Sequence, residues 1–290
     1  MHRHTANAGL AALTLLSLCA GCAKTTGTRN AVETRLEKTA ITARRKANKA
    51  HQALTAAIAP LAHDDDGQVA VAADDLTTGA DAAYSSTQEF VTASIVKVDI
   101  LSALLYQARQ SGHRLSPEEE ALATTMIENS NNDAASDLYD DAGGAEGIDR
   151  VNQVFGLSET TVGTDGFWGL TSTTVDDQIW LLRLVFTRPS VLTVHSQDHI
   201  QDLMSQVEAD QRWGVSAAAD DGTPFMVKNG WLPSGTTGLW EINSIGDVVH
   251  DGQRMLIAAL SEGNATEDSG ISLVQTVAEA AAGAIAASKG

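Results

Sequence analysis

The chain has 290 residues, of which 43% are hydrophobic and 19% charged, a composition that suits one large globular domain or two small ones. Residues 1–62 hold nine Lys and Arg against two Asp and Glu, whereas the remainder holds ten against thirty-five. An acidic body of this kind repels nucleic acid, which is therefore excluded as a partner. The only cysteines are Cys19 and Cys22, so a disulfide scaffold or a cysteine-based metal site is excluded once the chain is cleaved before Cys22.

The N-terminus carries a targeting signal. A short polar stretch at residues 2–4 precedes an apolar run at 9–20, which is too short to span a bilayer and predicts a signal peptide over 1–22. The run ends in Leu-Cys-Ala-Gly-Cys, which resembles a bacterial lipobox with Cys22 as the lipid acceptor, although Cys19 stands where leucine is usual. We expect an extracytoplasmic protein anchored to the membrane by lipid on Cys22, with simple secretion as the alternative. Residues 23–47 are then a polar tether and the start of a basic helix.

The rest of the chain, residues 48–290, is predicted to form one α+β domain. A helix is expected over 31–61, followed by a strand at 69–73 and a hairpin connection at 75–80. Apolar spacing predicts five helices in the middle of the chain: 93–110, 117–128, 143–156, 174–187 and 190–208. Short apolar runs at 225–227, 238–245 and 255–261 predict antiparallel strands, and an Ala-rich helix is expected over 271–288. Helices in the middle with strands on both sides favour an α+β fold over alternating βαβ units.

Ser94 and Lys97 are the first candidates for chemistry. They lie three residues apart at the start of a predicted helix, so they share one face and the amine can reach the hydroxyl. A serine becomes a useful nucleophile when a neighbouring amine removes its proton. A Ser followed three residues later by Lys occurs by chance about once in a chain of this length, so the pair alone also fits a capping serine beside a solvated lysine.

Two further motifs follow in order. Residues 130–132 read Ser-Asn-Asn, and residues 228–230 read Lys-Asn-Gly on a predicted strand. With Ser94 and Lys97 they resemble the S-x-x-K, S-D-N and K-T-G pattern of the class A β-lactamase and penicillin-binding serine hydrolase superfamily. The resemblance covers residues 48–288. It implies a helical region, an antiparallel sheet flanked by N- and C-terminal helices, an active-site cleft between them, and no metal or organic cofactor.

The resemblance also implies roles for individual residues. Ser94 would attack the acyl carbon, Lys97 would act as base, and Ser130 would pass a proton to the leaving nitrogen. The substrate would be held by four residues: Asn132, Lys228, Asn229 and Gly230. The backbone N–H groups of Ser94 and Trp231 would form the oxyanion hole.

Departures from the pattern bear on turnover. Asn229 replaces threonine in the third motif, and Asn131 replaces aspartate in the second. Class A β-lactamases use a loop glutamate to activate the deacylating water, but residues 160–170 contain no glutamate, and Asp165 is their only carboxylate. Asp165 is a candidate substitute base, with an ordinary turn role as the alternative. Loss of a general base typically slows the step it serves by about 10²- to 10⁴-fold, so we expect slow deacylation.

The sequence therefore predicts a monomeric serine acyl hydrolase that acts on β-lactams or on acyl-D-Ala-D-Ala-type peptides. One alternative is a D,D-peptidase or esterase that β-lactams merely inhibit. Another is a non-catalytic envelope lipoprotein that binds penicillin or another ligand on the same scaffold.

Overall fold

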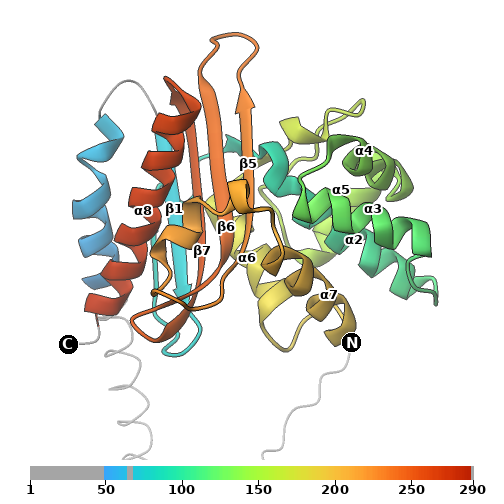
Figure 1. Ribbon diagram of the computed structural model, residues 1–290, viewed down its shortest axis with the longest axis horizontal. Coiled ribbons are helices and arrows are strands. Elements are labelled where there is room, and N and C mark those ends of the chain that lie inside the picture. Colours follow the sequence, from blue (N-terminus) through green and yellow to red (C-terminus); the bar gives the residue numbers. More distant parts are fainter. Residues whose placement is uncertain (1–48, 64–67, 289–290) are drawn as a thin grey trace, which may run out of the picture. The chain divides into compact units, whose positions relative to one another are not determined.

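The computed structural model describes residues 49–63 and 68–288. The expected signal peptide, the tether and Cys22 lie outside the described residues. The described part has three layers: a five-stranded sheet, a pair of helices on one face of it, and a larger helical region on the other (Figure 1). The predicted α+β architecture is confirmed.

The sheet is antiparallel, with strand order β2-β1-β7-β6-β5. Its strands are β1 (Gln68–Asp75), β2 (Asp81–Tyr84), β5 (Met226–Pro233), β6 (Trp240–His250) and β7 (Gln253–Asn264). The predicted strands are thus present, although the last three extend beyond the apolar runs that predicted them. β5 lies at an edge of the sheet, where Lys228 pairs with Ile245 and Gly230 with Asn243. Two short strands, β3 (Phe90–Val91) and β4 (Ser172–Thr173), pair separately from this sheet.

Beyond the helix over residues 49–58, the described part of the chain holds seven α-helices: α2 (Val96–Gln110), α3 (Pro117–Glu128), α4 (Asn132–Asp141), α5 (Gly144–Phe155), α6 (Val175–Phe186), α7 (Val194–Ser205) and α8 (Glu267–Ala287). α3 begins at Pro117 as predicted, because Ser116 and Glu119 form a reciprocal capping box ahead of it. The sequence analysis missed α4. Its N-cap is Asn131, whose side-chain oxygen accepts a hydrogen bond from the Ala134 N–H.

Two hydrophobic cores lie on opposite faces of the sheet. The first joins the sheet to α2 and its neighbouring helices, and the second joins it to α8 and the helix over residues 49–58. Ala50, Leu54 and Ile58 recur every four residues and are fully buried, so one face of that helix packs on the sheet. α8 is long and apolar enough to cross a bilayer, but its buried side chains belong to this second core. It is a core helix of the domain.

Candidate active site

Ser94 lies on a tight turn ahead of α2. The turn is the 3₁₀ element η2 (Ala93–Ile95), so the predicted helix begins slightly later than expected, at Val96. Ala93 has a φ of 47°, a left-handed conformation that costs about 1–3 kcal/mol in a non-glycine residue. The packing around the turn must therefore hold Ala93 in this left-handed conformation directly before Ser94.

Part of that support comes from Asn243 on β6. Its buried amide donates hydrogen bonds to the carbonyl oxygens of Val91, at 2.8 Å, and Thr92, at 3.0 Å. Its side-chain oxygen accepts from the Ser261 N–H at 3.2 Å. Asn243 thus ties the segment that leads to Ser94 to the centre of the sheet.

Gly230 brings the edge strand β5 against the same turn. A Cβ atom at this position would lie 2.7 Å from both the Ser94 nitrogen and the Thr92 oxygen, closer than real Cβ contacts come. Glycine is required here because the backbone of β5 touches the backbone of the serine turn. This contact sets the distance between the sheet and the Ser94 N–H group.

Lys97 and Ser130 meet beside Ser94. The fully buried Lys97 amine donates to the Ser130 carbonyl at 2.6 Å, to the Ser130 hydroxyl at 3.1 Å and to the Asn132 side-chain oxygen at 2.8 Å. Ser130 has a φ of 55°, so it too is held in a left-handed conformation. Within the described residues no hydrogen bond joins the Ser94 hydroxyl to Lys97, although catalytic contacts of this kind often tighten only when substrate is bound.

Lys228 completes the group from the opposite side. Its buried amine donates to the Ser130 hydroxyl at 2.9 Å and to the Asn229 carbonyl at 3.0 Å. One serine hydroxyl is therefore shared by two lysines that come from a helix and from the sheet edge. The structure brings together Ser94, Lys97, Ser130, Asn132, Lys228 and Gly230, as the three motifs predicted.

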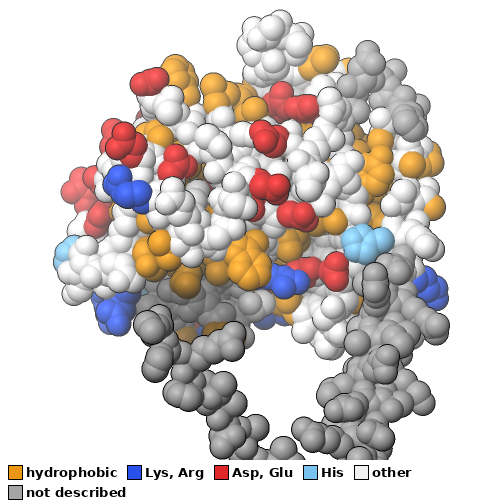
Figure 2. Space-filling model, turned by 180° about the vertical axis from the view of Figure 1, so that it is seen from behind, with side chains coloured by type: hydrophobic (Ala, Val, Ile, Leu, Met, Phe, Trp, Pro, Cys, Tyr) orange, Lys and Arg blue, Asp and Glu red, His pale blue; other side chains and the backbone are white. Residues whose placement is uncertain are grey.

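Burial lowers the pKa of both amines. Removal from water lowers the pKa of Lys97 to about 7, so near neutral pH a large fraction of the amine can accept a proton. Burial first, and the charge of Lys97 second, lower the pKa of Lys228 well below its usual value. On the molecular face shown in Figure 2, by contrast, exposed Asp and Glu side chains are more numerous than Lys and Arg.

Asn132 and Asn229 differ from each other in what they can offer a ligand. Asn132 is exposed, and no described residue accepts a hydrogen bond from its amide N–H group, so that donor is available. Asn229 is buried and donates to the carbonyls of Gln211, at 2.7 Å, and Trp213, at 3.1 Å. The expectation that the Asn229 side chain helps to hold the substrate is therefore wrong. Successive residues of a strand face opposite sides, and Asn229 faces away from Lys228 and Ser130.

The role predicted for Trp231 concerned only its backbone N–H group and stays a prediction, whereas the catalytic role considered for Asp165 needs correction. The Trp231 ring packs edge-on against Trp213, with centroids 6.0 Å apart, in the core beneath α8, so only its backbone can serve the site. Asp165 is exposed, with a φ of 55°, in a turn closed by a hydrogen bond from the Phe167 N–H to the Thr164 carbonyl. It has the turn role that was the alternative to a catalytic base.

Trp168 is a site residue that lies outside the three motifs, and the sequence did not predict its role. Its ring centroid lies 4.9 Å from the Lys97 amine, and its indole N–H donates to the Ser136 hydroxyl at 3.1 Å. It belongs to η3 (Trp168–Leu170), in the loop where a glutamate was sought. A loop side chain of this kind has no sequence spacing that would predict its direction.

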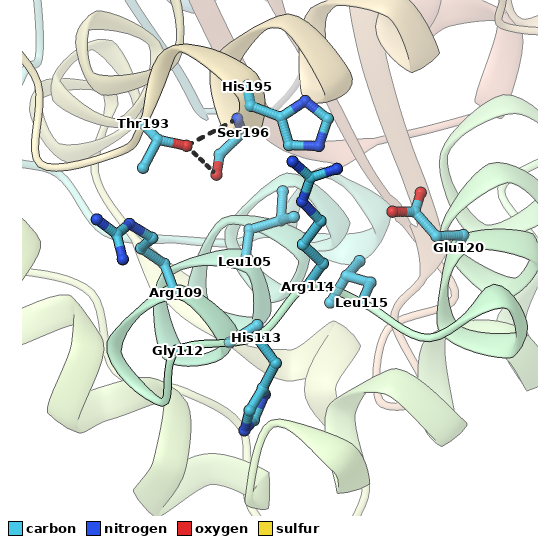
Figure 3. Close-up of a pocket in the computed structure, with 11 residues that line it drawn as sticks. Leu105, Arg109, Gly112, His113, Arg114, Leu115, Glu120, Thr193, His195 and Ser196 are labelled. Atoms are coloured by element: carbon cyan, nitrogen blue, oxygen red, sulfur yellow. Dashed lines mark hydrogen bonds between the residues drawn. The ribbon is translucent and has the colours of Figure 1, made fainter.

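A separate pocket lies at the far end of α2. It encloses about 350 Å³ between the C-terminal part of α2 and the start of α7, with Arg109, Arg114 and His195 around a floor that includes Leu105 (Figure 3). At 1.5 Å per residue, α2 separates this pocket from Ser94 by roughly 20 Å. None of the residues of the three motifs lines it.

The fold and the site together define a β-lactamase-like protein of the serine type. The Beta-lactamase enzyme family model matches residues 52–120 and 118–285, so the chain belongs to that family. The resemblance inferred from the three motifs is confirmed.

Solved structures agree on the fold. A class A β-lactamase from Bacteroides cellulosilyticus is 16% identical, with a TM-score of 0.71 over 82% of this chain and 99% of that one. A β-lactamase from Xanthomonas campestris is 18% identical, with a TM-score of 0.67 over 80% and 97%. PBP-A is 19% identical, with a TM-score of 0.69 over 83% and 96%. At these identities the likeness concerns the fold alone.

A Mycobacterium tuberculosis protein whose name describes it as a lipoprotein, LppW, is 28% identical over 173 residues, which are 57% of this chain and 54% of that protein. The chain therefore spans about half the length of the curated relative that it matches.

Proposed function

We propose that this protein is a serine hydrolase that is acylated by β-lactams on Ser94. The observation that carries the proposal is the convergence of Lys97 and Lys228 on the Ser130 hydroxyl, at 3.1 and 2.9 Å, beside Ser94. A buried amine with a pKa near 7 supplies the base that a serine nucleophile needs. PBP-A, which shares the fold, has a mutant structure described as an acyl-enzyme complex with penicillin G.

In the proposed acylation the Ser94 oxygen bonds to the lactam carbonyl carbon, and its proton moves to neutral Lys97. The carbonyl oxygen becomes an oxyanion against the N–H groups of Ser94 and Trp231. The carbon–nitrogen bond of the ring then breaks, and the nitrogen takes a proton from the Ser130 hydroxyl. Lys97, which carries the proton from Ser94, protonates Ser130 again and becomes neutral. The available Asn132 amide fits an acceptor on the substrate side chain.

Hydrolysis of the acyl-enzyme should be slow. In the described part of the chain, the segment over 160–170 holds no carboxylate except exposed Asp165, so no loop base stands beside Ser94. Loss of a base typically costs about 10²- to 10⁴-fold in the step concerned. A β-lactam ester would persist, whereas a peptide or ester whose leaving group departs leaves room for water.

Covalent labelling tests the proposal. The purified full-length chain is mixed with a fluorescent penicillin, chased with unlabelled penicillin, and followed by gel and intact mass. We expect a mass increase of one intact penicillin that lasts for hours and is lost in Ser94→Ala. Label lost within minutes would mean an efficient β-lactamase, and no label on a folded parent would refute acylation and favour a binding lipoprotein.

We also propose an envelope location through lipid on Cys22, which the lipoprotein name of the mycobacterial relative supports. The test is metabolic labelling with a fatty acid in a bacterial host that modifies lipoproteins. Label that survives in Cys22→Ala would contradict it.

A further inference from the structure

Hydrogen bonds to the indole N–H and to the backbone carbonyl hold Trp168 over Lys97. Its indole N–H donates to Ser136 on α4, and its carbonyl accepts from the Thr171 N–H at 3.1 Å. Thr171 in turn accepts a hydrogen bond from the Thr92 N–H at 2.8 Å, two residues before Ser94. The 3₁₀ turn of Trp168 also packs directly against the turn that carries Ser94. The ring is therefore a built part of the site wall.

The ring leaves little for a water molecule to bind on this side of Lys97. The three polar contacts of the Lys97 amine all go to the protein, two to Ser130 and one to Asn132. The face of the indole covers the same amine at 4.9 Å and offers no lone pair, while its single N–H points to Ser136. A hydrolytic water needs two or more polar partners to stay bound, and the Trp168 ring offers none in the space that it occupies beside Lys97.

We propose that Trp168 is a positioning residue that holds Lys97 and excludes water from its side of an acyl-Ser94 ester, so that it lengthens the life of the acyl-enzyme. The inference rests on the proposed acylation of Ser94. In the step that it slows, a water oxygen bonds to the acyl carbon, the bond from that carbon to Ser94 breaks, and the proton of the water passes through Lys97 to the Ser94 oxygen. This step is slow because the Trp168 ring leaves no room for the water molecule beside Lys97.

The experiment measures acylation and deacylation separately in Trp168 variants by label uptake and by label loss after a chase. In Trp168→Ala we expect deacylation to quicken at least about tenfold, and acylation to change by a smaller factor. Trp168→Phe keeps a ring face but loses the indole N–H, so its label lifetime should stay within about threefold of the parent. The matched control is Trp180→Ala, because the half-exposed Trp180 on α6 also donates its indole N–H, to the Phe155 carbonyl.

Trp168→Gln is a second test in case Trp168→Ala folds poorly. The glutamine amide N–H can still donate to Ser136, and the amide oxygen can bind a water. It should also shorten the label lifetime about tenfold. Labelled Trp168→Ala and Trp168→Gln with the parent lifetime would refute the inference alone, and so would Trp168→Phe that deacylates as fast as Trp168→Ala. Absence of label on the parent would refute the proposed acylation, which is a different result.

Discussion

Acylation of Ser94 should switch on as the pH rises through neutrality. Lys97 must be neutral to take the Ser94 proton, and burial lowers its pKa to about 7. With that value the neutral fraction is about one eleventh at pH 6, one half at pH 7 and ten elevenths at pH 8. The rate constant for acylation should therefore rise about tenfold between pH 6 and pH 8 and level off above.

The assay is the second-order rate of covalent labelling by a fluorescent penicillin from pH 5 to pH 9, with samples quenched in acid and counted by intact mass. A thermal melt at each pH checks that the chain stays folded. Lys97→Arg is the matched variant, because its guanidinium keeps the charge but cannot become neutral. It should label at least about a hundredfold more slowly at every pH.

Two results would refute this reasoning. A rate that stays flat from pH 5.5 to pH 8.5 would mean that Lys97 is not the titrating base. A rate that still climbs about tenfold per pH unit at pH 9, without levelling off, would mean that Lys97 keeps the pKa of a solvated lysine, and that its burial in the structure does not persist in solution.

Two further predictions concern the contacts around the site. Gly230→Ala should lower the acylation rate by about a hundredfold with the fold retained in a thermal melt, because its Cβ would push the Ser94 turn away; an unchanged rate would contradict the close contact of β5. Buried Asp99 has a pKa raised to about 7, mainly by desolvation, so its neutral form supports the fold at low pH and that support is lost as the pH rises from about 4 to about 7. Asp99→Asn should remove this dependence and gain up to about 4 kcal/mol on the parent over that range in urea unfolding; parallel stability curves for the two proteins would contradict it.

Residue type and order predicted most of the site, because the chemistry restricts both. A nucleophile and a base three residues apart must lie at the start of a helix to share one face. A lysine followed two residues later by a glycine fits a strand whose backbone lies close to the nucleophile. The prediction for Asn229 failed at the next level. Because successive side chains of a strand face opposite sides, Asn229 faces away from the side that Lys228 faces. This rule could have been applied to the sequence, but the analogy with Lys-Thr-Gly was followed instead.

The parts that the sequence did not predict depend on loops and weak patterns. α4 is ten residues long and acidic, and two of its four buried apolar residues are alanines, so Asn131 as a capping residue is the main mark of its start. The direction of Trp168 depends on hydrogen bonds that link a loop to α4 and to the Ser94 segment, and no periodicity encodes such contacts. Asn243 is likewise an ordinary polar residue of a strand until its partners across the sheet are known.

The energetic cost of this site bears on the choice between an enzyme and a binding scaffold. Two fully buried lysines share one hydroxyl, and burial disfavours the charged form of each. Ala93 and Ser130 add left-handed backbone conformations that cost about 1–3 kcal/mol each. A scaffold that only bound a ligand would be more stable with apolar residues in place of the buried amines, since replacing buried charges with well-packed apolar groups is often stabilising. A proton acceptor with a pKa near neutral pH is the property that burial of Lys97 provides, and it is the property that the proposed reaction of Ser94 requires.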